Sequence, residues 1–197
     1  MEVVLASRNA KKLAEMQALL APLGWQLRLV SDYTDEAAIE SASSFVENSL
    51  IKARHAAQVS GLPAIADDSG LEVAALNGAP GVYSARYAGE NASDADNNAK
   101  LLDALEGLDD SQRDARFVCV LTFMRHAADP TPVIAEGYWS GRILDAPRGE
   151  KGFGYDPLFF VPEHGCSSAE LQPEVKNRSS HRALATAALL ARLQSGQ

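Results

Sequence analysis

Two adjacent carboxylates are the side chains of this sequence best suited to chemistry. Asp67 and Asp68, followed by Ser69 and Gly70, come directly after Ala64–Ala66, a short apolar run that predicts a buried strand. Neighbouring carboxylates are costly unless a cation or hydrogen-bond donors compensate them, and hard oxygen ligands suit magnesium. Because adjacent strand residues point to opposite faces, one aspartate can be catalytic while the other is structural. An Asx-type turn that caps backbone N–H groups explains the same residues without catalysis.

A donor-rich cluster near the N-terminus is suited to an anion. It lies between the strand pattern of Val3–Ala6 and a helical pattern that Gly24 ends, and it consists of Ser7, Arg8, Asn9, Ala10, Lys11 and Lys12. Unpaired backbone N–H groups and the helix dipole favour a negative charge at such a position. The cluster lacks the glycine pattern of a P-loop, so a P-loop nucleotide site is not supported. A polar helix cap with solvated lysines is the alternative explanation.

Two further clusters stand in the C-terminal part of the chain. The first places glycines around aromatic rings, which lets a ring stack on a nucleobase, and consists of Gly152, Phe153, Gly154, Tyr155, Asp156 and Pro157. The second, Lys176–Arg182, precedes a helical pattern. Lys176 suits a phosphate, whereas His181 and Arg182 suit a carbonyl on a base edge. A glycine-shaped turn and a capped helix with solvated basic residues are the alternatives.

Composition and charge limit the class of protein. The chain has 197 residues, of which 46% are hydrophobic, and a formal net charge of −8. An acidic chain is a poor general nucleic-acid binder, so any phosphate must be bound by a local basic pocket. No apolar run is long enough to span a bilayer, the N-terminus does not have the pattern of a signal peptide, and there are two cysteines. We therefore expect a cytoplasmic protein without a disulfide framework. Zinc-ligand spacing and a Gly-x-Ser-x-Gly elbow are absent from the sequence.

The elements that must position these clusters alternate between strand and helix. Strand patterns cover residues 26–30, 64–66, 117–124 and 133–143, and an apolar segment covers 153–161. Helical patterns follow the first cluster and cover about 44–60, 94–105 and 180–193, with Ser44 and Ser93 as candidate caps. This order predicts an α/β fold with a mixed sheet. We expect one domain over residues 1–197, with a possible smaller lobe at about 110–165.

In this order, the clusters resemble the inosine/xanthosine triphosphate pyrophosphatase family. The resemblance covers nearly the whole chain, and its motifs are Ser7–Lys12, Phe45–Asn48 with Lys52–Ala53, Ala66–Gly70, Gly78–Gly81 with Tyr83–Tyr87, Gly152–Pro157 and Ser180–Arg182. A related group of nucleotide pyrophosphatases opens with a Ser-Pro-Arg-Arg pattern, which Asn9–Lys12 does not match.

The resemblance implies both an architecture and a reaction. The architecture is an elongated mixed β-sheet flanked by helices, with a nucleotide cleft between two lobes, in a homodimer. The reaction is the hydrolysis of ITP, dITP and XTP to the monophosphate and pyrophosphate, with one Mg²⁺ per subunit. Such an enzyme would keep deaminated purines out of DNA and RNA, and its partner would be a small nucleotide rather than a nucleic acid or a membrane.

Carried over by motif, the resemblance also implies residue roles. Asp68 would be the proton acceptor and a magnesium ligand, with Glu40 as the other metal-binding carboxylate. The triphosphate would be held by Ser7, Arg8, Asn9, Ala10, Lys11, Lys12, Lys52, Ser69, Arg86 and Lys176. The base would be held by Phe153, Gly154, Tyr155, Asp156, His181 and Arg182. Many members have a glycine near Arg8 or Lys11, which leaves the individual roles of these two cations open.

The residues are consistent with this chemistry. A carboxylate near its ordinary pKa of about 3.9 is a weak base at neutral pH, so Asp68 is expected to orient water more than to deprotonate it. His181 and Arg182 would be satisfied by the 6-oxo group of inosine and left unpaired by the amino group of adenine. Guanine also carries a 6-oxo group, so its rejection must come from the 2-position. A pyrophosphatase for a modified pyrimidine or another purine is the second hypothesis, and a nucleotide sensor without catalysis is the third.

Overall fold

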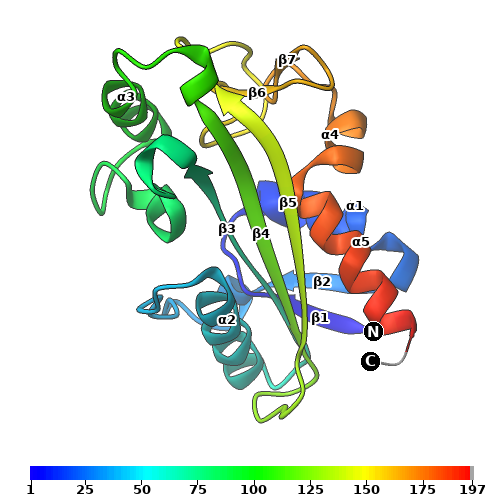
Figure 1. Cartoon of the computed structure of the whole chain (residues 1–197). Coiled ribbons are helices and arrows are strands. Elements are labelled where there is room, and N and C mark those ends of the chain that lie inside the picture. Colours follow the sequence, from blue (N-terminus) through cyan, green and yellow to red (C-terminus); the bar gives the residue numbers. More distant parts are fainter. Residues whose placement is uncertain (196–197) are drawn as a thin grey trace. The chain divides into compact units, whose positions relative to one another are not determined.

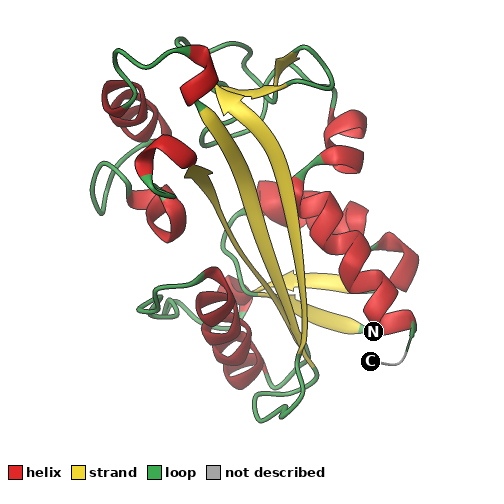
Figure 2. Cartoon of the chain, viewed as in Figure 1, coloured by secondary structure: helices red, strands yellow, loops and turns green. Residues whose placement is uncertain are grey.

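The computed structural model describes residues 1–195, which form one seven-stranded mixed sheet with helices beside it (Figures 1 and 2). The order of the strands across the sheet is β2-β1-β3-β4-β5-β6-β7. Strand β1 pairs in parallel with both β2 and β3, whereas β6 pairs antiparallel with β5 and β7. The α/β class and the mixed sheet expected from the sequence are therefore confirmed. The strands are β1 (Glu2–Leu5), β2 (Gln26–Leu29), β3 (Ala64–Val73), β4 (Asp114–Met124), β5 (Val133–Ile143), β6 (Phe159–Val161) and β7 (Cys166–Ser167).

Five α-helices are present in the described residues, and local sequence explains their ends. They are α1 (Ala10–Leu19), α2 (Phe45–Ser60), α3 (Asp94–Ala104), α4 (Pro173–Ser179) and α5 (His181–Gln194). The hydroxyl of Ser44 accepts the Glu47 N–H at the start of α2, and Gly61 ends this helix at φ 68°. Ser93 and Asp96 form a complete capping box on α3. None of these helices combines the length and the apolar character that crossing a bilayer requires.

The chain divides into two compact units, each with its own core. Unit 1 contains Met1–Asp68, Cys119–Gly137 and the chain from Arg182 onward, and unit 2 contains Ser69–Val118 and Tyr138–His181. Strands β3, β4 and β5 contribute residues to both units. The unit boundary in β3 falls directly after Asp68, so the residues that follow this carboxylate belong to unit 2.

In unit 1, helices cover the strands on both faces (Figure 1). Leu5 and Ile65 pack with Met16 of α1 and with residues of α5, whereas their neighbours Val4 and Ala64 pack with α2. This alternation follows the two-residue period of a strand. It places odd-numbered β3 residues on the face of α1 and α5 and even-numbered ones on the face of α2.

The core of unit 2 is built around aromatic and aliphatic side chains. Phe117 and Phe159 are in ring contact, with centroids 4.5 Å apart, and Leu101 and Leu105 of α3 are fully buried in the same cluster. Tyr155 also belongs to this cluster. The C-terminal end of α3 and Tyr155, which precedes β6, are therefore parts of one packed core.

The structure differs from the sequence-based expectation in four local features. Asp67 and Asp68 lie inside β3 rather than at a strand end, because that strand continues to Val73. Helix α1 ends at Leu19, and Pro22 lies in a short 3-10 turn that follows. Only Phe159–Val161 of the apolar segment 153–161 is strand. Residues 173–179, to which the sequence patterns assign no element, form α4, which starts at Pro173.

Candidate active site

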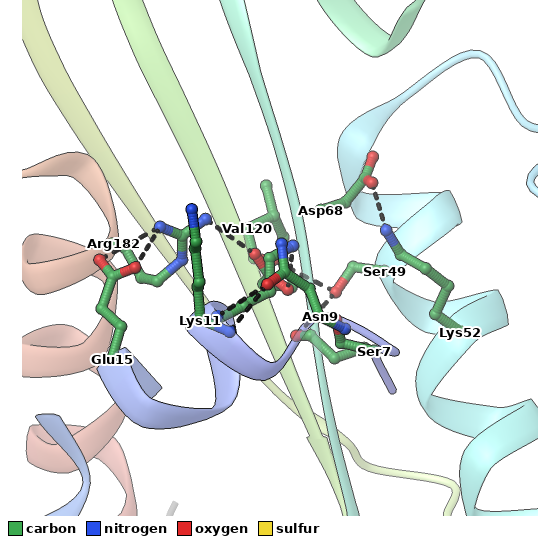
Figure 3. A network of polar contacts seen from close by, with 12 residues as sticks. Ser7, Asn9, Lys11, Glu15, Ser49, Lys52, Asp68, Val120 and Arg182 are labelled. Carbon is green, nitrogen blue, oxygen red and sulfur yellow. Dashed lines mark hydrogen bonds and ion pairs between the residues drawn. The ribbon is translucent and has the colours of Figure 1, made fainter. Parts of the chain in front are cut away.

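The two neighbouring aspartates of β3 face different partners in unit 1. Asp67 lies 3.0 Å from the Lys12 ammonium and 3.2 Å from the Arg182 guanidinium. Asp68 lies 2.5 Å from the Lys52 ammonium of α2 (Figure 3). Both carboxylates are buried, with exposed fractions of 2% and 6%. The alternation of the strand therefore assigns one carboxylate to each face of the sheet.

The environment drives the pKa values of these two groups in opposite directions. Burial raises the pKa of Asp68 to about 6, although the Lys52 ammonium opposes this effect. Burial also disfavours the charged form of Asp67, but Lys12 and Arg182 outweigh it and hold the pKa of Asp67 well below its usual range. Asp68 is consequently a stronger base than an ordinary aspartate, whereas Asp67 is a permanent anion. The expectation of an ordinary pKa for Asp68 is corrected by its burial.

Asp68 and Glu40 meet at a single ammonium group. Lys52 Nζ donates to Asp68 Oδ1 at 2.5 Å and to Glu40 Oε2 at 3.2 Å. Burial lowers the pKa of Lys52, but the surrounding carboxylates, Asp68 first, outweigh this and raise it, so the ammonium stays charged. Two carboxylates thus converge on one positive charge from a strand and from the segment before α2.

The donor set has the chemistry that magnesium requires. Among residues 1–195 there is no group of three or more His, Cys, Asp or Glu side chains arranged to hold a metal. Mg²⁺, however, is usually bound by one or two carboxylates together with water and substrate phosphates. Asp68 and Glu40 supply two hard oxygen ligands at a place that already attracts a cation. These residues therefore fit a magnesium ion that shares its coordination with a nucleotide.

The N-terminal cluster forms the start of α1 and one wall of a cavity. The Asn9 side chain caps α1 by accepting the N–H groups of Lys11 and Lys12 at 2.9 and 3.2 Å. Arg8 donates to the carbonyl of Asp35. A cavity of about 260 Å³ in unit 1 is lined by Ala6, Ser7, Arg8, Lys12, Val30, Glu36, Ala37, Ala38, Glu40, Lys52, His55 and Asp67. The cluster thus contains a structural cap in Asn9, while Ser7, Arg8 and Lys12 border the cavity.

Arg182 is held deep in unit 1 by two acidic residues. Its exposed fraction is 2%, and NH1 donates to both carboxylate oxygens of Glu15, at 3.2 and 3.0 Å. NH2 donates to Asp67 at 3.2 Å. The Asp67 and Glu15 charges outweigh burial and raise the pKa of Arg182 above its usual value. In Figure 3, dashed lines join the guanidinium to Glu15 on one side and lead toward β3 on the other.

In unit 2, the glycine-rich cluster is organised by one buried carboxylate. Asp156 accepts the Phe153 N–H at 2.9 Å, the Ser168 hydroxyl at 2.8 Å and the Lys176 ammonium at 2.6 Å. The Lys176 ammonium also lies 5.6 Å from the centre of the Phe153 ring. Gly152, at φ +80°, has no space for a side chain, because a Cβ there would approach Asp156 Oδ2 to 2.1 Å. The turn thus brings an aromatic ring and a cation together.

The other unit 2 candidates differ in their surroundings, because Tyr155 and His181 are buried whereas Arg86 contacts exposed residues. The Tyr155 hydroxyl donates to the carbonyl of Ser84 at 2.8 Å, and burial raises the pKa of this phenol. The imidazole of His181 stacks on the Phe117 ring with centroids 4.7 Å apart. Arg86 lies over the Tyr83 ring and 3.8 Å from Glu90. Ser69 is a half-buried residue of β3.

Comparison with known proteins identifies the family. The model of the Ham1 family matches residues 3–192. The chain belongs to the Ham1 family. A relative from Vibrio cholerae, named dITP/XTP pyrophosphatase, is 58% identical over 92% of this chain and 90% of its own. A relative with the same name from Pseudomonas aeruginosa is 57% identical over 98% and 96% of the two chains. The solved structure of a HAM1 protein from Coxiella burnetii has a TM-score of 0.91 and 52% identity, and covers 99% of both chains.

The structure of this Ham1-family chain separates the predicted site residues into two sets. Unit 1 holds Ser7, Arg8, Asn9, Ala10, Lys11, Lys12, Glu40, Lys52, Asp68 and Arg182, and unit 2 holds Ser69, Arg86, Phe153, Gly154, Tyr155, Asp156, Lys176 and His181. Within unit 1, Asp68, Glu40 and Lys52 are in direct contact. Within unit 2, Asp156, Lys176 and Phe153 are in direct contact.

Three residues that contact or border the candidate site were not predicted from the sequence. Glu15, which pairs with Arg182, and Ser168, which donates to Asp156, were not identified. Glu15 and Arg182 are 167 positions apart, so no local spacing could connect them. His55, which borders the unit 1 cavity, lies on the same helix as Lys52 at a spacing of three residues, and this spacing was the available signal.

Proposed function

We propose that this chain is a nucleoside triphosphate pyrophosphatase that hydrolyses dITP, ITP and XTP to the monophosphate and pyrophosphate. The observation that carries the proposal is the contact of buried Asp68 and half-buried Glu40 with the Lys52 ammonium, in a chain whose relatives of 57–58% identity are named dITP/XTP pyrophosphatase. Removal of these nucleotides from the pool would keep deaminated bases out of DNA and RNA.

In the proposed reaction, Asp68 accepts a proton from the water that attacks the α-phosphorus. Its raised pKa of about 6 supports this role, because a general base is most effective when its pKa lies near the working pH. Asp68 and Glu40 would hold one Mg²⁺ per subunit, which neutralises charge on the triphosphate when bound. The Lys52 ammonium beside both carboxylates keeps Asp68 ionised at neutral pH and contributes positive charge to the leaving pyrophosphate.

The remaining candidate residues are proposed to bind the nucleotide. Ser7, Arg8 and Lys12, which border the unit 1 cavity, would contact the phosphates together with Asn9, Ala10 and Lys11 at the start of α1. Ser69, Arg86 and Lys176 of unit 2 would contribute to the same function. Phe153 supplies an aromatic face for the base, with Gly154, Tyr155 and Asp156 forming the turn that carries it. His181 and Arg182 remain our candidates for the 6-oxo group.

A substrate panel tests the proposed function. The purified protein would be incubated with ITP, dITP, XTP, ATP and GTP in the presence of Mg²⁺, and pyrophosphate, orthophosphate and monophosphate would be measured separately. We expect pyrophosphate and monophosphate in equal amounts, formed much faster from the deaminated purines than from ATP or GTP. Equal turnover of ATP and ITP, or release of orthophosphate alone, contradicts the proposal.

We further propose that the protein acts as a homodimer in the cytoplasm. Light scattering on the eluate of a gel-filtration column measures the mass directly, and twice the chain mass of 21.0 kDa is expected. A mass of one chain at micromolar concentration would exclude the dimer.

A further inference from the structure

A two-residue clamp on α3 holds the backbone of the turn that carries Phe153. Asp94 Oδ2 accepts the Gly154 N–H at 2.7 Å, and Asn98 Nδ2 donates to the Gly154 carbonyl at 3.0 Å. Asp94 and Asn98 are four positions apart and therefore lie on the same side of the helix. Both backbone groups of one glycine are thus bound by side chains 60 and 56 positions away in the sequence.

The helix that carries the clamp is itself firmly anchored in unit 2. Leu101 and Leu105, at its other end, are fully buried in the core. Asn97 accepts the Ala88 N–H at 2.8 Å and donates to the Ala85 carbonyl at 3.2 Å. Because the segment 85–88 includes Arg86, the same helical turn also fixes the backbone on either side of this candidate phosphate ligand.

The turn has little other means of fixing Gly154. Asp156 binds the Phe153 N–H and Lys176, and the Tyr155 hydroxyl binds Ser84, but these contacts hold the residues before and after the glycine. Gly154 adopts φ 60°, in the left-handed region, where a glycine has alternative conformations available at low cost. The two α3 side chains select one of them.

We propose that Asp94 and Asn98 are positioning residues for purine recognition, which set the orientation of the Phe153–Asp156 turn without contacting the nucleotide. This inference rests on the proposed function, because the turn is assigned there to the base. Two hydrogen bonds order the turn before the substrate arrives. Substrate binding therefore loses less conformational entropy than it would if the substrate itself had to order the turn.

The test compares four single variants. Asp94→Ala and Asn98→Ala each remove one arm of the clamp, and Asp94→Asn keeps an oxygen that can accept the Gly154 N–H. Asp96→Ala is the matched control, because Asp96 lies in the same turn of α3 and stabilises it through the capping box without reaching Gly154. Loss of helix stability alone would therefore affect Asp96→Ala at least as much as Asp94→Ala.

Two measurements are made on each variant. Amide hydrogen exchange of the peptide containing Gly154 needs no substrate and reports the order of the turn. Steady-state kinetics with ITP separate KM from kcat. For Asp94→Ala and Asn98→Ala we expect faster exchange and a KM about fivefold higher, the factor that corresponds to one hydrogen bond of about 1 kcal/mol, with kcat changed much less. Asp94→Asn should recover most of the wild-type KM, and Asp96→Ala should match the wild type.

The possible failures are distinguishable. Unchanged exchange in Asp94→Ala and Asn98→Ala, or an equal rise of KM in Asp96→Ala, overturns the clamp even when the wild-type enzyme is active on ITP. A wild-type protein that hydrolyses none of the deaminated purines overturns the proposed function, and with it the purine role of the turn. In that case, the amide hydrogen exchange measurement still shows whether Asp94 and Asn98 order Gly154.

Discussion

At the scale of single residues, Asp67 and Asp68 show how neighbouring groups of one type acquire different properties. Both are buried, and burial alone would raise both pKa values. Two cations, Lys12 and Arg182, reverse this effect for Asp67, whereas the single Lys52 ammonium beside Asp68 is shared with Glu40 and does not. Carboxylates whose environments separate their pKa values are typical of a site in which one is structural and the other reactive.

The pKa of Asp68 predicts the acid side of the pH–rate profile. The base must be ionised to accept a proton, so kcat/KM for ITP should fall tenfold per pH unit below about 6 at low Mg²⁺. Higher Mg²⁺ should move this fall to lower pH, because the metal and the proton compete for the same carboxylate. Asp68→Asn should lose at least about 10²-fold in kcat while remaining folded by circular dichroism. A fall near pH 4 that does not respond to Mg²⁺, or near-normal activity of Asp68→Asn, contradicts this role.

Asp67 is expected to contribute to stability. Asp67→Ala leaves Arg182, which is 2% exposed, and Lys12 without their shared carboxylate, and an uncompensated buried charge costs about 3–5 kcal/mol of unfolding free energy. The change is measured by urea unfolding at pH 7.5. Glu2→Gln is the control, because its pair with Arg28 is exposed to solvent and should contribute little to stability. A loss below 1 kcal/mol for Asp67→Ala would show that Glu15 alone compensates Arg182.

At the scale of elements, helix α2 holds the segment that carries Glu40. The buried Asn48 side chain accepts the Ala42 N–H at 3.0 Å and donates to the Ala42 carbonyl at 3.3 Å, as a neighbouring strand would. One turn further, Lys52 binds Glu40, and two turns further the His55 imidazole lies 3.2 Å from the Glu36 carbonyl. Three side chains on one side of α2 thus fix a segment that has no regular structure of its own.

Asn48 should therefore affect metal binding more than it affects the chemical step. Asn48→Ala removes both hydrogen bonds to Ala42, so Glu40 is held less precisely, and the Mg²⁺ concentration for half-maximal activity should rise about tenfold. The rate at saturating Mg²⁺ should change less. Gln58→Ala, at an exposed position of the same helix, serves as the control and should leave both values unchanged. Equal loss of rate at all Mg²⁺ concentrations would indicate a general folding defect instead.

Helices and strands could be predicted where nearby residues determine their ends. They could not be predicted where contacts with residues far away in the sequence determine them. Helix α2 was predicted to within one residue because Ser44 and Gly61 mark both ends. The continuation of β3 through Asp67–Gly70 could not be predicted, because this polar, glycine-containing run is typical of a turn. It becomes a strand because Lys12, Lys52 and Arg182 supply compensating charges from 16 to 115 positions away.

The same limit applies to the candidate site. The motif residues Asp68, Lys52 and Glu40 were identified from the sequence and do meet in the structure. Glu15, Asp94 and Asn98 were not, because each acts on a residue more than 50 positions away through one or two hydrogen bonds. The local sequence around a carboxylate or an amide on a predicted helix does not indicate such a distant partner.

At the scale of the whole molecule, the net charge of −8 coexists with four candidate-site cations that are each paired with a carboxylate. Lys12, Lys52, Lys176 and Arg182 each pair with a buried or half-buried carboxylate. These four positive charges are thus compensated within the protein. A bound Mg²⁺ offsets part of the negative charge of a small triphosphate, so such a ligand is compatible with cations that are already paired.

Buried aspartates with lowered pKa values and one with a raised pKa determine how the stability of the metal-free protein depends on pH. Two aspartates, Asp67 and Asp129, have pKa values below their usual range, and Asp129 is paired with Arg125. Their contribution to the free energy of unfolding is therefore present above about pH 4 and is lost in acid. Asp68, with a pKa of about 6, has the opposite effect on stability. The folded state binds the proton of this carboxyl more tightly than the unfolded state does. Its contribution to the free energy of unfolding is therefore present below about pH 4 and is lost as the pH rises through 6.

The metal-free protein should therefore be most stable near pH 5. Between pH 5 and 7 the unfolding free energy should fall by about 1.3 kcal/mol, as Asp68 ionises in its buried position. Urea unfolding in EDTA at intervals of half a pH unit measures this slope, and the same measurement on Asp68→Asn subtracts the contribution of all other ionisable groups. The slope should be clearly smaller in Asp68→Asn than in the wild type. It should also be reduced in the wild type by Mg²⁺, because a cation bound to ionised Asp68 stabilises the folded state by mass action. An equal slope in both proteins would show that Asp68 does not ionise in this range, and would remove the physical basis for its role as the base.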